Sequence, residues 1–103
     1  MLIGVTYKSG ISDTRESPAS EVARILIEKG ARVSYFDPLV ESWALGTESP
    51  LMKQEDPISA CQEQDIVILL QMVKDCEIKQ IVDASPIFFD TRGVVDSDAS
   101  HRL

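Results

Sequence analysis

A strand, a helix and a second strand follow one another at the start of the chain, and this order constrains the fold most. Leu2–Thr6 is a short apolar run, typical of a strand buried on both faces. Ser17 and Pro18 predict a helix start, because serine is a common N-cap residue and proline suits the first helical position. Apolar residues at helical spacing follow, and Gly30 predicts where the helix ends. Ala31–Phe36 is the second expected strand, so the segment predicts a parallel βαβ unit.

The rest of the chain continues the alternation of helices and strands. The further expected elements are a helix at Pro57–Gln62, a strand at Asp65–Leu70, a helix at Asp75–Val82 and a strand at Ile87–Asp90. Residues 41–56 show weak periodicity and predict a long loop with room for one short element. These observations predict an α/β fold with three layers, in which helices cover both faces of a mostly parallel sheet. We expect one domain over residues 1–95 and a frayed polar tail over residues 96–103.

Composition excludes several classes of protein. The net charge of −7 argues against binding to nucleic acid or to an anionic membrane surface, both of which need basic patches. Cys61 and Cys76 form no CxxC pair and come with a single histidine, so neither a zinc site nor a disulfide framework is predicted. Two buried free thiols in a reducing cytoplasm are expected instead. Because the chain opens directly on an apolar strand, we also expect it to be a domain of a longer protein.

Cations follow the expected strands at the points where these strands end. Lys8 and Arg15 come after the first strand, and Arg92 comes after the last. The carboxyl ends of parallel strands meet at one edge of a sheet, where α/β proteins bind their ligands. Arginine offers a planar fork for phosphate oxygens and lysine a compact charge, so the pattern predicts a phosphate or diphosphate site.

Each of these residues also has a plainer interpretation. The cations could be solvated and paired with nearby carboxylates, and this alternative stays open. Asp37 could contact a ribose, but the sequence Asp37-Pro38 favours a turn that ends a strand. Tyr7 could stack on a base or pack against the protein. Cys61 and Cys76 are expected to be structural rather than reactive.

Several motifs, in order, resemble the C-terminal domain of the UDP-glucose/GDP-mannose dehydrogenase family. The similarity runs from Leu2 to about Asp96, and its most specific piece is Asp13–Pro18. The matching pieces are Gly4–Lys8, Asp13–Pro18, Gly30–Ala31, Asp37–Pro38 and Phe89–Arg92.

The resemblance implies a fold, an activity and a set of site residues. The family's domain is flavodoxin-like, that is, related to the Rossmann-like folds. The family oxidises the 6-hydroxyl of a nucleotide-sugar to a carboxylate in two hydride transfers to NAD. By resemblance, Tyr7 and Lys8 would contact the nucleotide-sugar, Arg92 would hold its diphosphate, and Arg15 would reach the NAD pyrophosphate. The implied partners are an N-terminal NAD domain of the same protein and further copies in a homodimer or larger assembly.

The chain departs from the family in what it lacks. The nucleophilic cysteine of the family belongs to a glycine-rich stretch upstream of this domain, and neither cysteine here has that setting. The glycine-rich NAD fingerprint is missing as well, so NAD would be bound mainly by another domain. We therefore expect this chain alone to be inactive. Ser9 stands where proline is common in the family, and this concerns only the shape of the loop.

The sugar and the class of function leave alternatives. The run Asp37–Val40, followed by Trp43, is similar to the branch that acts on UDP-N-acetylhexosamines such as UDP-N-acetylmannosamine. A phosphoacceptor receiver is excluded, because Lys8 follows the first strand and Gln71 the third, where that class has aspartates. A non-catalytic flavodoxin-like module for oligomerisation or binding stays open.

Overall fold

Five parallel strands form the central sheet of the molecule. The computed structural model describes residues 1–6, 18–45, 50–73, 78–93 and 100–102. Within this part of the chain, every strand pair of the sheet is parallel. The strands lie in the order β2 (Tyr35–Phe36), β1 (Leu2–Ile3), β5 (Val67–Leu69), β6 (Phe88–Asp90) and β7 (Ser100–Arg102). This is the flavodoxin-like order 2-1-3-4-5, and it confirms the expected α/β fold.

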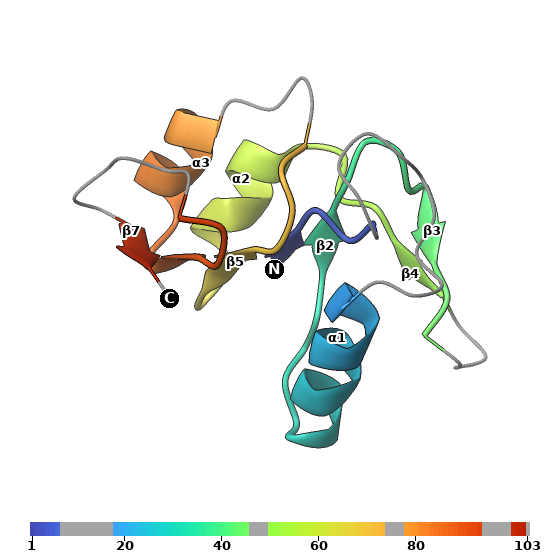
Figure 1. Cartoon of the computed structure of the whole chain (residues 1–103). Helices are drawn as coiled ribbons and strands as arrows, with labels where there is room; N and C mark the ends of the chain where they lie inside the picture. The colour runs from blue at the N-terminus through green and yellow to red at the C-terminus, as the bar shows by residue number, and fades with distance from the viewer. Residues whose placement is uncertain (7–17, 46–49, 74–77, 94–99, 103) are drawn as a thin grey trace.

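Helices cover the two faces of this sheet (Figure 1). The helix α1 (Pro18–Glu28) joins β1 to β2 and lies on one face. The helices α2 (Pro57–Gln62) and α3 (Ile78–Ala84) pack together on the other. A two-stranded antiparallel hairpin, β3 (Ser42–Trp43) and β4 (Leu51–Met52), packs on the same side as α1. The result is the three-layer arrangement that the sequence predicts.

The strands place successive side chains in two separate cores. Leu2 belongs to the core under α1, and its neighbour Ile3 to the core under α2 and α3. Tyr35 and Phe36 divide in the same way. Because side chains alternate across a strand, a strand covered on both faces needs apolar residues at every position. This is why the strands appear in the sequence as continuous apolar runs.

Local signals explain where two helices begin and end. Gly30 has φ +91° and follows the last turn of α1, and its N–H donates to the carbonyl of Ile27 at 3.0 Å. The N–H of Ala31 donates to the carbonyl of Leu26 at 3.0 Å, which completes a Schellman motif. The start of α2 is capped by Asp56, whose carboxylate accepts from the N–H of Ser59. Both boundaries agree with the sequence-based prediction.

Two regions hold more regular structure than the sequence predicts. The β3–β4 hairpin occupies the expected loop at 41–56, and Trp43 in it is 1% exposed. Three residues of the expected frayed tail, Ser100–Arg102, form β7 beside β6. Both elements have only two or three residues per strand, too few for a period to be recognised. In the part of the chain that the structure describes, no helix is long and apolar enough to cross a membrane.

Candidate functional site

The candidate site lies where β1 and β5 end side by side. The chain runs from β1 to β2 on one side, while β5 continues the sheet on the other. Ligands of open parallel sheets bind in the crevice outside the carboxyl ends of the strands, at the point where the strand order reverses. Here that point is bordered by Gly4 and Val5 after β1 and by Leu70 and Gln71 after β5.

Gly4 and Gln71 touch through their backbones at this point. Gly4 has φ +78°, a conformation that favours glycine. A Cβ atom on Gly4 would lie 2.1 Å from the carbonyl oxygen of Gln71 and 2.7 Å from its carbonyl carbon. No real side chain tolerates such distances, so only glycine allows β1 and the segment after β5 to approach this closely. The N–H groups of Leu70 and Gln71 both point to the carbonyl oxygen of Ile3, at 2.9 Å and 3.4 Å.

The end of β6 is tied to the end of β5. The hydroxyl of Thr91 donates to the carbonyl of Leu69 at 2.6 Å, and the Thr91 N–H donates to the same oxygen at 3.2 Å. Asp90 is fully buried, and its Oδ1 accepts from the N–H groups of Arg92 and Gly93 at 2.9 Å and 2.8 Å. These bonds hold the turn that carries Arg92.

Arg92 stands at this edge as an exposed cation. Its guanidinium forms no ion pair with any residue that the structure describes. Asp90, the nearest carboxylate in sequence, uses one oxygen for backbone N–H groups. Asp90 and Arg92 therefore form no direct ion pair with each other. An arginine free to use its planar fork is suited to a phosphate group.

Asp37 has a structural role at the neighbouring strand end. It is 2% exposed, and its Oδ2 accepts from the N–H of Val5 while Oδ1 accepts from the N–H of Leu39, both at 3.0 Å. With both oxygens used and the side chain buried, a ribose contact is not what the geometry provides. The expected strand-ending turn is confirmed, since the Val40 N–H donates to the Asp37 carbonyl at 3.0 Å.

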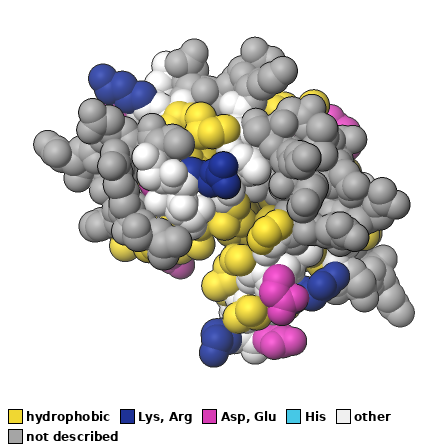
Figure 2. All heavy atoms as spheres, viewed as in Figure 1, with side chains coloured by type: hydrophobic (Ala, Val, Ile, Leu, Met, Phe, Trp, Pro, Cys, Tyr) yellow, Lys and Arg dark blue, Asp and Glu magenta, His cyan; other side chains and the backbone are white. Residues whose placement is uncertain are grey.

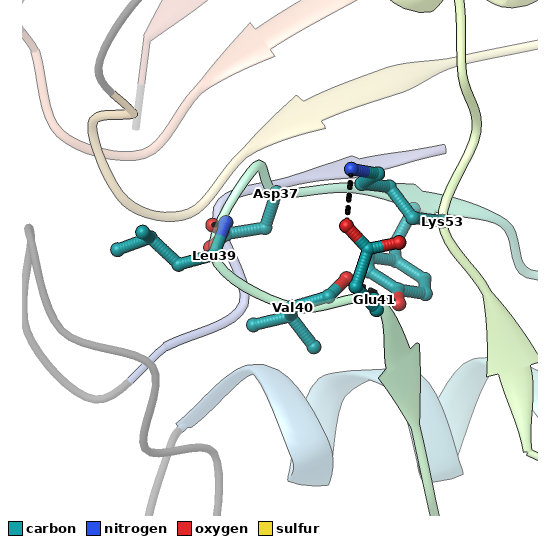
Figure 3. A network of polar contacts seen from close by, with 6 residues as sticks. Asp37, Leu39, Val40, Glu41 and Lys53 are labelled. Atoms are coloured by element: carbon teal, nitrogen blue, oxygen red, sulfur yellow. Dashed lines mark hydrogen bonds and ion pairs between the residues drawn. The ribbon is translucent and has the colours of Figure 1, made fainter.

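A polar network holds the hairpin against β2 (Figure 3). Lys53 Nζ points to Glu41 and donates to its Oε1 at 2.8 Å, and this hydrogen bond raises the pKa of Lys53. The buried hydroxyl of Tyr35 donates to the carbonyl of Val40 at 2.7 Å. Burial, together with the charges of Glu41 and Asp37, raises the pKa of Tyr35 to about 12. These contacts stabilise the fold beside the site.

The remaining site predictions fall in three places. Tyr7, Lys8 and Arg15 lie outside the described residues, as does Cys76. Cys61 is fully buried in the core under α2 and α3, as expected, and burial raises the pKa of its thiol. Trp43 is buried against Tyr35, with ring centroids 5.4 Å apart. Gln71 and Thr91 were missed as site-forming residues, although polar residues directly after buried strands were a usable signal.

A second concave region lies away from the strand ends that carry Arg92. Over the described ranges, no group of three or more histidine, cysteine or acidic side chains could hold a metal ion. A hollow of about 600 Å³ lies at the opposite edge, between the amino ends of β1 and β5 and the entry to β2. Met1, Arg32 and Asp65 are among its lining residues. This hollow is separate from the strand ends that carry Arg92.

Comparison with known proteins identifies the family. The model of the "UDP-glucose/GDP-mannose dehydrogenase family, UDP binding domain" matches residues 1–97. The chain belongs to this family. Its fold and its motif order are those of the family's C-terminal domain.

Relatives in this family act on different sugars. The UDP-glucose 6-dehydrogenase of Rickettsia conorii is 30% identical over 99% of this chain and 25% of its own length. The UDP-N-acetyl-D-mannosamine dehydrogenase of Methanococcus maripaludis is 33% identical over 92% of this chain and 22% of its own length. The structure of the UDP-N-acetyl-mannosamine dehydrogenase Cap5O from Staphylococcus aureus is 25% identical over 98% of this chain and 24% of its own, with a TM-score of 0.71. The chain thus spans about a quarter of the length of these relatives.

Proposed function

We propose that this chain is the nucleotide-sugar-binding domain of an NAD-dependent nucleotide-sugar 6-dehydrogenase. In this role Arg92 binds the diphosphate, and Tyr7 and Lys8 contact the nucleotide-sugar. The observation that carries the proposal is the exposed Arg92, which follows β6 at the same sheet edge as the switch point, is held by Asp90, and has no carboxylate partner among the described residues. The match to a UDP-binding family domain supports the same role for the chain.

The described residues do not fit NAD. A pyrophosphate cradle after the first strand needs glycines that leave their backbone open to the ligand. Gly4 instead meets the carbonyl of Gln71, which fills the space where a ligand would approach. NAD and the nucleophilic cysteine are therefore proposed to reside in an N-terminal domain of a larger chain. Arg15 is proposed to reach the NAD pyrophosphate from this domain.

The substrate is proposed to be a UDP-N-acetylhexosamine of the UDP-N-acetylmannosamine type. Support comes from the run Asp37–Val40 with Trp43, and from relatives named as UDP-N-acetylmannosamine dehydrogenases. Asp37 and Trp43 are both buried, so this run supports the proposal as a mark of the branch and not as a sugar contact.

The test is NADH formation by the complete protein that carries this chain. It should be offered UDP-N-acetylmannosamine, UDP-N-acetylglucosamine, UDP-glucose and GDP-mannose in turn. Two NADH per sugar with UDP-N-acetylmannosamine would support the full proposal, and the same yield with another sugar would correct the substrate alone. Folded protein that binds NAD but forms no NADH with any of the four would refute the enzymatic role.

A structural role in oligomerisation is a second candidate, favoured by one observation. Ile25 and Ile27 on α1 are 43% and 41% exposed, and Figure 2 shows apolar side chains on this helix among charged ones. Residues two positions apart in a helix point to different sides, so Ile25 and Ile27 offer two separate apolar contacts to another protein surface. Replacement of Ile25 and Ile27 by serine should dissociate such an assembly, whereas Arg92→Ala should leave the assembly intact and weaken only nucleotide binding.

A further inference from the structure

We propose that Gly4 is a positioning residue for Arg92, and that it acts through hydrogen-bonded contacts across the ends of β1, β5 and β6. The inference rests on the proposed function, because it assigns Gly4 a role in nucleotide binding. Gly4 directly follows β1, and Arg92 lies two residues after the end of β6. In the sheet, β5 lies between these two strands. We refer to the contacts that link Gly4 to Arg92, between backbone groups and through the Thr91 hydroxyl, as the strand-end seam.

The first link of the strand-end seam joins β1 to β5. The backbone of Gln71 lies where a Cβ of Gly4 would be, and the Leu70 N–H donates to the carbonyl of Ile3 at 2.9 Å. The obstacle is a carbonyl group of the main chain, so no change of side-chain rotamer can relieve it. A methyl group at residue 4 must therefore push the segment after β5 away by about 1 Å or turn its peptide, because closely packed atoms cannot overlap.

The second link joins β5 to the turn that carries Arg92. The carbonyl of Leu69, two residues before Gln71, accepts both the hydroxyl and the N–H of Thr91. Thr91 is directly followed by Arg92, whose N–H is held by Asp90 at 2.9 Å. A displacement of the segment after β5 is thus passed to Arg92 through bonds to neighbouring residues. Misplacement of a binding group by about 1 Å can cost up to roughly a hundredfold in function.

Gly30 provides a matched control for the substitution Gly4→Ala. Both glycines have positive φ, +78° and +91°, so alanine is strained at both positions. A Cβ at Gly30, however, meets no atom within 4 Å. Gly30 also lies at the end of α1, away from the strand-end seam. Effects shared by the two variants report backbone strain, and effects confined to Gly4→Ala report the contact with Gln71.

The experiment records backbone amide NMR spectra of the 103-residue chain and its variants, first without ligand and then during titration with UDP. In Gly4→Ala, and not in Gly30→Ala, we expect shifted amide signals of Thr91, Arg92 and Gly93. We also expect a UDP affinity at least about tenfold lower. The loss should be much smaller when Gly4→Ala is made in an Arg92→Ala chain, since residues that act through one another are not additive. Unchanged amides at 91–93, or an affinity equal to that of Gly30→Ala, would overturn the proposal.

A second variant keeps the test valid where Gly4→Ala does not fold. Thr91→Val removes the hydroxyl bond to Leu69 without adding an atom near Gly4, and it should lower UDP affinity while leaving the chain folded. If Thr91→Val binds UDP as tightly as the unsubstituted 103-residue chain does, the strand-end seam does not position Arg92. If neither the unsubstituted 103-residue chain nor the complete protein that carries it binds UDP, the proposed function fails, and the role of Gly4 in binding fails with it. The ligand-free amide signals still show whether the seam couples residues 4 and 92.

Discussion

Asp37 joins two neighbouring strand ends, because its Oδ2 accepts the N–H of Val5 at 3.0 Å across the gap between β2 and β1. Its other oxygen accepts the N–H of Leu39, so one buried carboxylate holds both the exit of β1 and the turn after β2. Residues 7–17, which include the proposed ligand contacts Tyr7 and Lys8, follow directly after this exit. Asp37 therefore contributes to the site by holding the backbone that leads to it.

Asp37→Ala should lower the free energy of unfolding by about 3 kcal/mol, because it removes two hydrogen bonds to a charged group and leaves a buried N–H without its partner. Urea unfolding followed by fluorescence measures this. Trp43 is the single tryptophan and is 1% exposed, so its emission reports exposure of the core.

The control for Asp37 is Asp56→Ala. Asp56 is exposed and caps α2 through one bond, so its loss should cost only about 1 kcal/mol. Equal losses for the two variants would show that the Asp37 carboxylate does not join the strand ends.

Sequence reasoning succeeded where an element had its own local signals. Gly30 marks the end of α1 by chemistry that acts within a few residues. The continuous apolar run around Val67–Leu69 marked a strand covered on both faces. Such signals need no knowledge of distant contacts, and they were enough for the first four strands of the sheet, β1, β2, β5 and β6, and for the helices.

Sequence reasoning failed where tertiary contacts decide. β3 and β4 are two residues each, and they exist because Trp43 packs against Tyr35 and because Lys53 pairs with Glu41. β7 likewise depends on pairing with β6. At the site, the position of Arg92 was predictable from the order of parallel strands. The contact of Gly4 with Gln71 was not, because the two residues are far apart in sequence.

The Tyr35 hydroxyl predicts a loss of stability at alkaline pH. Its pKa in the fold is about 12, against about 10 when unfolded, so between these values the unfolded chain loses its proton first. The contribution of Tyr35 is therefore complete below pH 10 and is lost as pH rises toward 12. Urea unfolding at a series of alkaline pH values measures this dependence.

Tyr35→Phe separates this contribution from that of other groups. The variant should be less stable at neutral pH by about 1 kcal/mol, because a buried hydrogen bond to Val40 is lost. It should also lose less stability than the parent chain between pH 10 and 12. Identical alkaline profiles for the two chains would exclude Tyr35 as the cause.

Cys61 should resist thiol reagents in the folded chain. The thiol is fully buried, and burial raises its pKa, which lowers the fraction of reactive thiolate. In a Cys76→Ser chain, which retains Cys61 as its one cysteine, labelling by a chromogenic disulfide should follow the unfolding rate and accelerate in urea. Fast labelling of a chain that is folded by fluorescence would contradict the burial of Cys61.

Arg92→Ala should weaken UDP binding by roughly tenfold or more, since a charge-assisted contact to phosphate is lost. Stability should hardly change, because the Arg92 side chain is exposed and makes no ion pair with a described residue. Titration of the chain with UDP, followed by amide NMR, measures the affinity.

Arg32→Ala is the matched control for Arg92→Ala. Arg32 is also exposed, but it lines the hollow at the amino ends of the strands, at the opposite edge of the sheet. The two variants change the net charge equally, so any general electrostatic effect on an anionic ligand is shared. A UDP affinity that falls only in Arg92→Ala places the diphosphate at the carboxyl edge. Equal losses in both variants would mean that UDP responds to total charge, and the assignment of Arg92 would then be wrong.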